Sequence, residues 1–192
     1  MLMRLQEGDS IPISEFVSKY DPVTRRIVMT GGLLPFANKV GDGEITLPDL
    51  NNGNKPMTMA EKIIARNLVG ATSGSTVSPG DAVIARVHGG YSHEFTTAQV
   101  HNFLKEEYGE DYTLPNPDKF AVFEDHLLYA HFNPKFATHL EKIQELRDLQ
   151  VDFQKHTGVR DFSAVDGISP GICHQVAREE FIDVGDFIQA TD

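Results

Sequence analysis

The second half of the chain alternates between two hydrophobic periods, which predicts strands that alternate with helices. Short apolar runs typical of buried strands occupy 78–87, 118–126, 159–165 and 185–192. Helical spacing occupies 96–109, 133–158 and a shorter stretch around 173–181. Strands in alternation with helices indicate a layered α/β domain with a mostly parallel sheet.

The helix boundaries are marked by residues that satisfy free backbone groups. Thr58 and Glu61 have the spacing of a capping box, which predicts a helix start there. Asn133 and Pro134 suit the start of the longest helix, and Gly158 suits its end. The buried face of the helix at 96–109 is predicted to consist of Val100, Phe103, Leu104 and Tyr108.

Residues 1–56 differ from the rest of the chain because they are rich in Gly, Pro, Asp and Asn. The stretch RRIVMTGGLLPFA (25–37) predicts a short strand, a Gly-Gly turn and a short helix, and 38–56 is predicted to be a loop or linker. We therefore place a boundary after residue 56. An N-terminal extension and linker precede it, and the α/β domain occupies 57–192.

Composition narrows the classes of protein that the chain can represent. The formal net charge of −11 argues against a nucleic-acid partner, because phosphate contacts need clustered Lys and Arg. No apolar run approaches the roughly 20 residues of a membrane span, and the N-terminus lacks a secretory apolar core, so we expect a cytoplasmic protein with no membrane partner. A single cysteine excludes an internal disulfide, a four-cysteine zinc site and an iron–sulfur cluster held by this chain alone.

Polar side chains follow the predicted strands, where ligands bind in an open α/β sheet. These residues are His93 and Glu94, Asp125 and His126, His174 within GICHQV, and Asp192 at the end of the last strand. A histidine held by a carboxylate can act as a general acid or base, so this edge is a candidate site for proton transfer. The carboxylate that pairs with His174 is left open between Asp125 and Asp192.

Other interpretations of these residues are structural. The His174 segment can be a hydrogen-bonded loop, and Cys173 fits a small buried residue. Three histidines, His93, His126 and His174, also match the ligand number of some catalytic zinc sites. The remaining histidines are expected on helix surfaces or in loops: His88, His101, His131, His139 and His156.

Six motifs occur in an order and spacing that resemble a known family. They are MTMAEKIIAR, VSPGDAVIARV, SHEFTT, FEDH, GICHQV and GDFIQATD, within 57–192. Together they resemble the N-terminal part of the aconitase superfamily, and in particular the large-subunit family of 3-isopropylmalate dehydratase. The resemblance implies a three-layer α/β/α domain, here incomplete, whose first part is 57–192. It also implies a hydro-lyase that uses a 4Fe-4S cluster as Lewis acid.

The resemblance assigns roles to individual positions. It makes Asp125 and His126 the acid–histidine pair near the leaving hydroxyl, and His174 an active-site histidine. Asp192 would open an Asp-Ser-His-Thr motif as a further catalytic residue. Substrate contacts would fall to His93 and Thr96. Cys173 is not a cluster ligand in this alignment, so no metal ligand is expected within the chain.

The chain also departs from the family pattern, because the residues expected after Asp192 are absent. Those residues include the cluster cysteines, the arginines that bind substrate carboxylates, and the swivel domain. We therefore expect a segment that is inactive alone and needs a downstream segment or a swivel-domain small subunit. The substrate class would be a small hydroxy di- or tricarboxylic acid such as 3-isopropylmalate or citrate. Two alternatives remain: a non-catalytic remnant or binding module, and a swivel-domain origin for the GGLLPFA stretch.

Overall fold

The computed structural model describes residues 2–47, 50, 53 and 55–191. The chain divides into two compact units, Met1–Arg86 and Val87–Asp192. The boundary that we predicted after residue 56 therefore falls inside the first unit. No helix of the described residues is long and apolar enough to cross a membrane.

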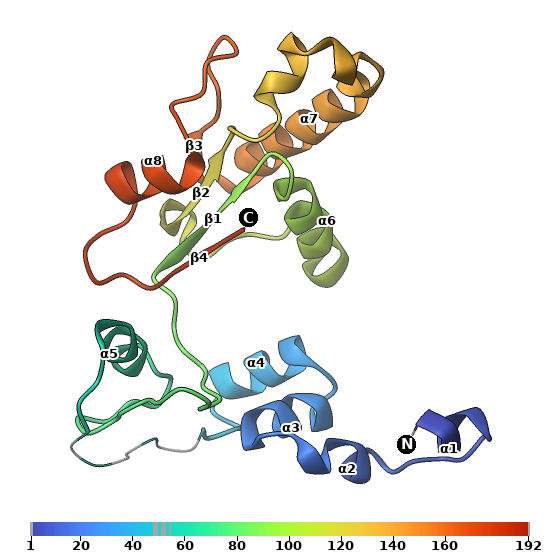
Figure 1. The fold of residues 1–192 in the computed structure, drawn as a ribbon, viewed down its shortest axis with the longest axis vertical. Coiled ribbons are helices and arrows are strands. Elements are labelled where there is room, and N and C mark those ends of the chain that lie inside the picture. The colour runs from blue at the N-terminus through green and yellow to red at the C-terminus, as the bar shows by residue number, and fades with distance from the viewer. Residues whose placement is uncertain (1, 48–49, 51–52, 54, 192) are drawn as a thin grey trace. The chain divides into compact units, whose positions relative to one another are not determined.

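The first unit is helical, coloured blue to green in Figure 1. Its helices are α1 (Leu2–Gln6), α2 (Ile13–Phe16), the 3-10 helix η1 (Val17–Lys19), α3 (Pro22–Met29), α4 (Leu33–Gly41) and α5 (Met59–Arg66).

The strand predicted near residue 25 is wrong, because α3 runs through it. The Asp21 carboxylate accepts the N–H groups of Val23 and Thr24 at 2.9 Å and so caps the helix start. The predicted turn before α4 is confirmed, since Gly31 and Gly32 both have positive φ.

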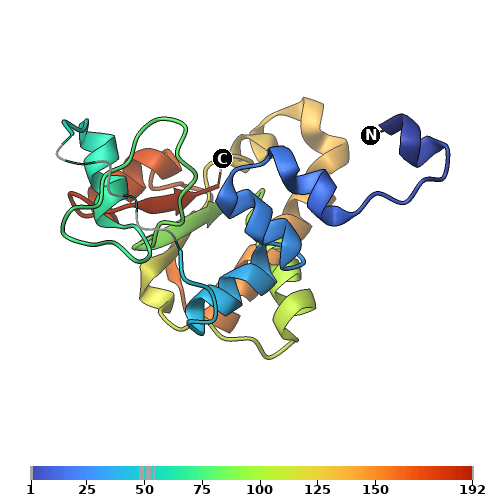
Figure 2. The same ribbon diagram turned by 90° about the horizontal axis from the view of Figure 1, so that it is seen from below.

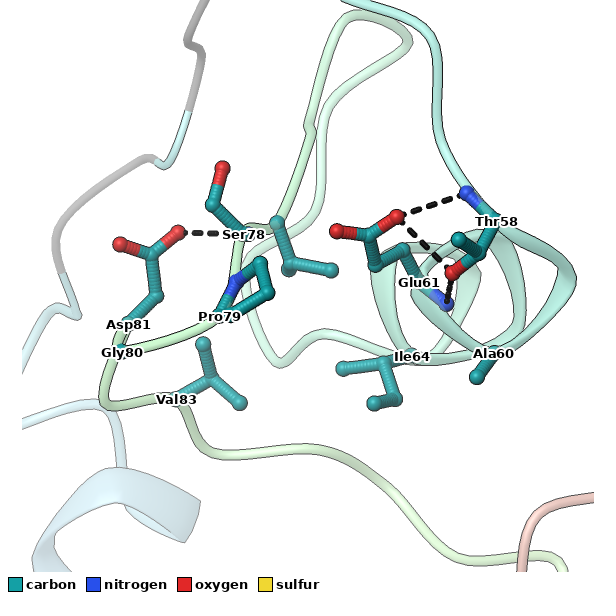
Figure 3. A pocket seen from close by; sticks show the side chains of 10 residues that line it. Thr58, Ala60, Glu61, Ile64, Ser78, Pro79, Gly80, Asp81 and Val83 are labelled. Carbon is teal, nitrogen blue, oxygen red and sulfur yellow. Dashed lines mark hydrogen bonds between the residues drawn. The ribbon is translucent and has the colours of Figure 1, made fainter.

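Helix α5 begins with the predicted capping box. The Thr58 N–H donates to Glu61 Oε2 at 2.6 Å, and the Glu61 N–H donates to Thr58 Oγ1 at 3.3 Å. A cavity of about 420 Å³ lies between this helix start and the turn at 78–81, as Figure 3 shows. Two carboxylates line this cavity, those of Glu61 and Asp81. The Asp81 carboxylate accepts the Ser78 N–H. Both carboxylates are thus engaged in local capping, and none of the predicted site residues that the structure describes lines the cavity.

The second unit is built on a four-stranded sheet in the described part of the chain. The strands are β1 (Gly89–His93), β2 (Phe120–Phe123), β3 (Arg160–Phe162) and β4 (Ile188–Ala190). Their order is β3-β2-β1-β4, and every pair is parallel, which confirms the predicted α/β class. The helices are α6 (Thr97–Tyr108), α7 (Leu140–Thr157) and α8 (Cys173–Glu180), with 3-10 helices η2 (Pro117–Lys119), η3 (Leu128–Phe132) and η4 (Pro134–His139).

The first strand lies beyond the predicted stretch 78–87, so that prediction is wrong. The stretch forms only an isolated antiparallel bridge between Leu68 and Ala85. The strand instead begins with Gly89 and Gly90, which follow the predicted stretch. A Cβ atom on Gly89 would overlap the carbonyl oxygen of Lys119, and one on Gly90 would lie 2.9 Å from the carbonyl oxygen of Gln189. Glycine is therefore required where neighbouring backbones approach β1 closely.

We predict that Gly89→Ala lowers the free energy of unfolding of the second unit by about 1–3 kcal/mol, because the added methyl must displace the Lys119 carbonyl. Urea denaturation followed by circular dichroism measures this loss. Gly41→Ala in α4 is the control, because its Cβ would meet open space, and it should stabilise by roughly 0.5–1 kcal/mol. An unfolding free energy of Gly89→Ala equal to that of the native chain would contradict the close approach of the Lys119 carbonyl to Gly89.

Side chains alternate across the sheet and divide the core into two layers. Ala121 and Phe123 pack with Tyr91 against α8, in a cluster that includes Cys173 and Val176. Phe120 and Val122 point to the other face, where the packing residues come from α6, α7 and the segments beside them: Val100, Leu104, Tyr112, Leu114, Phe153 and Val159. Figures 1 and 2 show α8 on one face of the sheet and α6 and α7 on the other. This is a three-layer α/β/α arrangement.

Helix α6 buries a histidine that the sequence analysis had placed on the surface. His101 has no exposed surface, whereas the predicted core residues Phe103 and Tyr108 are 47% and 53% exposed. The His101 ring is bonded through Nδ1 to the Tyr112 hydroxyl at 2.7 Å and through Nε2 to Asp152 at 2.9 Å. Both ring nitrogens are satisfied, which allows a polar ring in the core. The inward positions of Val100 and Leu104 are confirmed.

Because Tyr112 is buried, we expect the second unit to lose stability in alkaline solution. Burial, followed by the nearby charge of Asp152, raises the pKa of Tyr112 to about 12 from the ordinary 10.0. The raised pKa stabilises the folded chain below pH 10, and this contribution is lost as the pH rises through 12. The difference corresponds to roughly 2–3 kcal/mol. Denaturation midpoints between pH 9 and 12 should fall less in Tyr112→Phe than in the native chain. An identical fall in both would contradict this, and the exposed Tyr129→Phe is the control.

Candidate active site

Asp125 and His126 form a hydrogen-bonded pair directly after β2. The distance between His126 Nδ1 and Asp125 Oδ1 is 2.6 Å. A carboxylate can only accept, so Nδ1 carries the proton and Nε2 of the neutral ring is an acceptor. The Asp125 side chain is 9% exposed and the His126 side chain 36% exposed. The ring is therefore oriented by a nearly buried carboxylate and can be reached from solvent.

His93 lies against His126, as their shared sheet edge predicts. The two rings are stacked with centroids 3.7 Å apart and planes 12° from parallel. His93 is the last residue of β1 and is only 1% exposed. Its Nδ1 accepts the N–H of Phe95 at 3.3 Å. In this geometry His93 supports the flat face of the His126 ring.

His174 is placed at the start of α8 and is held by a residue that the sequence analysis missed. Its Nδ1 lies 2.6 Å from the hydroxyl oxygen of Tyr91, and the two rings meet edge to face. Of the two carboxylates proposed as its partner, Asp125 is bonded to other groups and Asp192 lies outside the described residues. Tyr91 could have been inferred only from its position on β1, where alternation turns it towards α8.

The Asp125 carboxylate links the two halves of the site. Its Oδ1 bonds to His126, and its Oδ2 accepts the N–H of Cys173 at 2.5 Å. Cys173 opens α8, so the carboxylate also fixes the helix start that carries His174. The cysteine side chain is fully buried, as predicted.

Thr96, the second predicted substrate contact, joins two strand ends. Its hydroxyl lies 2.6 Å from the hydroxyl of Thr191, which follows β4, and donates to the carbonyl of His93 at 3.3 Å. It thus connects the loop after β1 to the edge strand.

Two groups of potential metal ligands occur among the described residues. They are His93, Glu94 and His126, and Asp125, His126 and Cys173. His174 belongs to neither group. A metal ion needs lone pairs that converge on one point, whereas the in-plane lone pairs of two stacked rings lie in two nearly parallel planes. The arrangement favours proton transfer by a histidine–carboxylate pair over metal binding by the stacked histidines.

An α/β sheet with histidines and carboxylates at the carboxyl ends of its strands defines a candidate enzyme active site. The chain is similar to the 3-isopropylmalate dehydratase large subunit 1 of Thermotoga maritima, with 28% identity over 135 residues, which are 70% of this chain and 28% of that protein. It is also similar to the chloroplastic large subunit of Arabidopsis thaliana, with 28% identity over 139 residues, which are 71% of this chain and 26% of that protein. No family model matches the chain.

These relatives confirm the resemblance predicted from the motifs. The matched region spans about a quarter of the length of the curated relatives. The activity of the whole relatives is therefore a proposal for this chain.

The residues of this chain do not fit a 4Fe-4S cluster. Such a cluster is held by several cysteine thiolates, and the sequence contains one cysteine. Cys173 is fully buried and packs in the core with Tyr91 and Phe123.

Proposed function

We propose that this chain supplies acid–base residues to a hydro-lyase that removes water from a small hydroxy di- or tricarboxylic acid, such as 3-isopropylmalate or citrate. The observation that carries the proposal is the 2.6 Å hydrogen bond between His126 Nδ1 and Asp125 at the carboxyl edge of the sheet. The likeness to two dehydratase large subunits supports the reaction class.

Dehydration requires one proton to be removed from carbon and one to be delivered to the leaving hydroxyl. In our proposal, the imidazolium form of His126 delivers its Nε2 proton to that hydroxyl, which leaves as water, and the base that takes the carbon proton is supplied by another part of the complete enzyme. Asp125 keeps the Nδ1 proton in place and stabilises the imidazolium form. A group with this role must be reachable, and the His126 side chain is 36% exposed.

His174 is proposed to bind the substrate beside His126. It is exposed at the start of α8, and Tyr91 orients its ring through Nδ1. The N–H or nitrogen at Nε2 is then directed away from the Tyr91 hydroxyl and can hydrogen-bond a substrate carboxylate or hydroxyl. His93 and Thr96 are proposed to lie beside the same substrate, and Asp192 to be a further residue of the site.

The complete enzyme is proposed to need groups that these 192 residues lack. A cluster would be bound by cysteines from other sequence, because this chain has only Cys173. The relatives are named as large subunits, so a small subunit is the proposed protein partner. The chain alone is accordingly expected to be inactive.

A chimeric enzyme tests the proposal. The segment of the Thermotoga maritima large subunit that matches this chain is replaced by the segment from this chain, and the product is combined with its small subunit under anaerobic conditions. Ultraviolet absorbance then follows the formation of the unsaturated acid. Dehydration above that of a chimera with Asp125→Asn and His126→Gln supports the function. A chimera that assembles its cluster but has no activity contradicts it and favours a non-catalytic module.

A further inference from the structure

Glu94 is a fully buried carboxylate at the end of β1, yet its bonding partners are backbone groups of another loop. Its Oε1 accepts the N–H of His126 at 2.6 Å and that of Leu127 at 2.5 Å. Its Oε2 accepts the N–H of Asp125 at 3.2 Å. Three successive N–H groups after β2 therefore converge on one carboxylate that has no exposed surface.

This arrangement fixes the backbone that carries the Asp125–His126 pair. Hydrogen bonds to a charged acceptor are stronger than neutral ones, and an unsatisfied buried group is costly. With residues 125–127 held by three bonds, the Asp125 carboxylate can reach His126 Nδ1 with one oxygen and the Cys173 N–H with the other. The orientation of the His126 ring thus depends on Glu94. Glu94 acts through the backbone of residues 125–127 and not directly on the ring.

Glu124 has a similar position at the end of the next strand. It is 4% exposed, accepts the N–H of Ala164 in the loop after β3 at 2.9 Å, and forms an ion pair with Arg147. Each of these two strand-end glutamates holds the loop that follows the neighbouring strand. Both carboxylates are buried, but Glu94 binds the backbone of residues 125–127 and Glu124 binds that of Ala164. Glu124 can therefore serve as a control for Glu94.

We propose that Glu94 is a positioning residue for His126: its carboxylate binds the backbone of residues 125–127 and so sets the orientation and the Nδ1-protonated form of the His126 ring. The catalytic meaning of this inference rests on the proposed function of His126. The structural part concerns the chain itself and does not depend on activity.

The test compares Glu94→Gln, Glu94→Asp and Glu124→Gln in the full chain by amide hydrogen exchange and by nitrogen NMR of the histidine rings. An amide side chain presents a donor to at least one of the three N–H groups, so Glu94→Gln loses bonds. We expect exchange of at least one of the amides of Asp125, His126 and Leu127 to become about 10- to 100-fold faster. The ring signals of His126 should move towards those of free histidine.

The other variants separate positioning from general stability. Glu94→Asp retains an acceptor and should recover part of the native His126 signals. Glu124→Gln should speed exchange at Ala164 and leave the His126 ring signals in place. The His101 ring, bonded to Tyr112 and Asp152, reports that the fold is intact.

Two outcomes would overturn the inference. One is a folded Glu94→Gln chain with native His126 ring signals and native exchange at 125–127. The other is an equal loss of protection throughout the second unit in both glutamine variants, which would make Glu94 a general stabilising residue. Native activity of a His126→Gln chimeric enzyme would instead contradict the proposed function and leave the Glu94 result standing.

Discussion

His126→Gln is expected to lower kcat of the chimeric enzyme by about 10²–10⁴-fold, the usual contribution of a positioned general acid or base. Glutamine keeps a donor that can reach Asp125, but it cannot transfer a proton near neutral pH. Because the side chain is 36% exposed, the main packing contact that the substitution disturbs is its stacking on His93. Steady-state kinetics should therefore show a fall in kcat with little change in thermal stability.

His139→Gln is the matched control for this prediction. His139 is an exposed histidine at the end of η4 and is not among the candidate site residues. The same chemical change there should leave kcat at the native value. Equal losses in both variants would mean that His126 contributes to structure or assembly and not to proton transfer.

Phe123→Ala is expected to give the largest loss of stability, about 3–5 kcal/mol in the free energy of unfolding of the second unit. The ring is 1% exposed. It stacks on Phe162 with centroids 4.8 Å apart and meets the edge of Tyr91 at 5.2 Å. Alanine would leave a cavity between the sheet and α8. Since whole domains are stable by only about 5–15 kcal/mol, much of the native stability would be lost.

The exposed Phe132 provides the comparison for this substitution. Phe132→Ala removes a ring that is 79% exposed and should change the stability by no more than about 0.5 kcal/mol. Urea denaturation followed by circular dichroism measures both variants. A loss below about 1 kcal/mol in Phe123→Ala would show that the cluster relaxes around the gap. Weaker orientation of His174 should accompany the larger loss, because Tyr91 rests on Phe123.

Much of the layered fold follows from local sequence signals. The stretches predicted for the second, third and fourth strands contain β2, β3 and β4, and Gly158 caps the end of the long helix as expected. The predicted start of that helix is wrong, because Asn133 caps the 3-10 helix η4 and α7 begins only at Leu140. The first strand was misplaced because its glycines are typical of loops. Their real function is to allow the approach of Lys119 and Gln189, which are distant in sequence. Contacts of this kind leave no local pattern.

The candidate site was predictable in its residue types but not in its pairing. Position after a strand identified Asp125 and His126, and their hydrogen bond follows that prediction. The contact of His174 with Tyr91 depends on the docking of α8 against β1, which sequence spacing does not specify. Glu94 was noticed only as an acid beside His93, because backbone donors 31 to 33 residues away are invisible in the sequence.

A double-mutant cycle on kcat of the chimeric enzyme tests most directly the claim that Asp125 and His126 form one acid–base pair. It compares Asp125→Asn, His126→Gln and the double variant with the native sequence. If the two residues act as a unit, the double variant will be no more than about threefold slower than His126→Gln alone. Losses that multiply, or a native kcat in His126→Gln, would contradict the account.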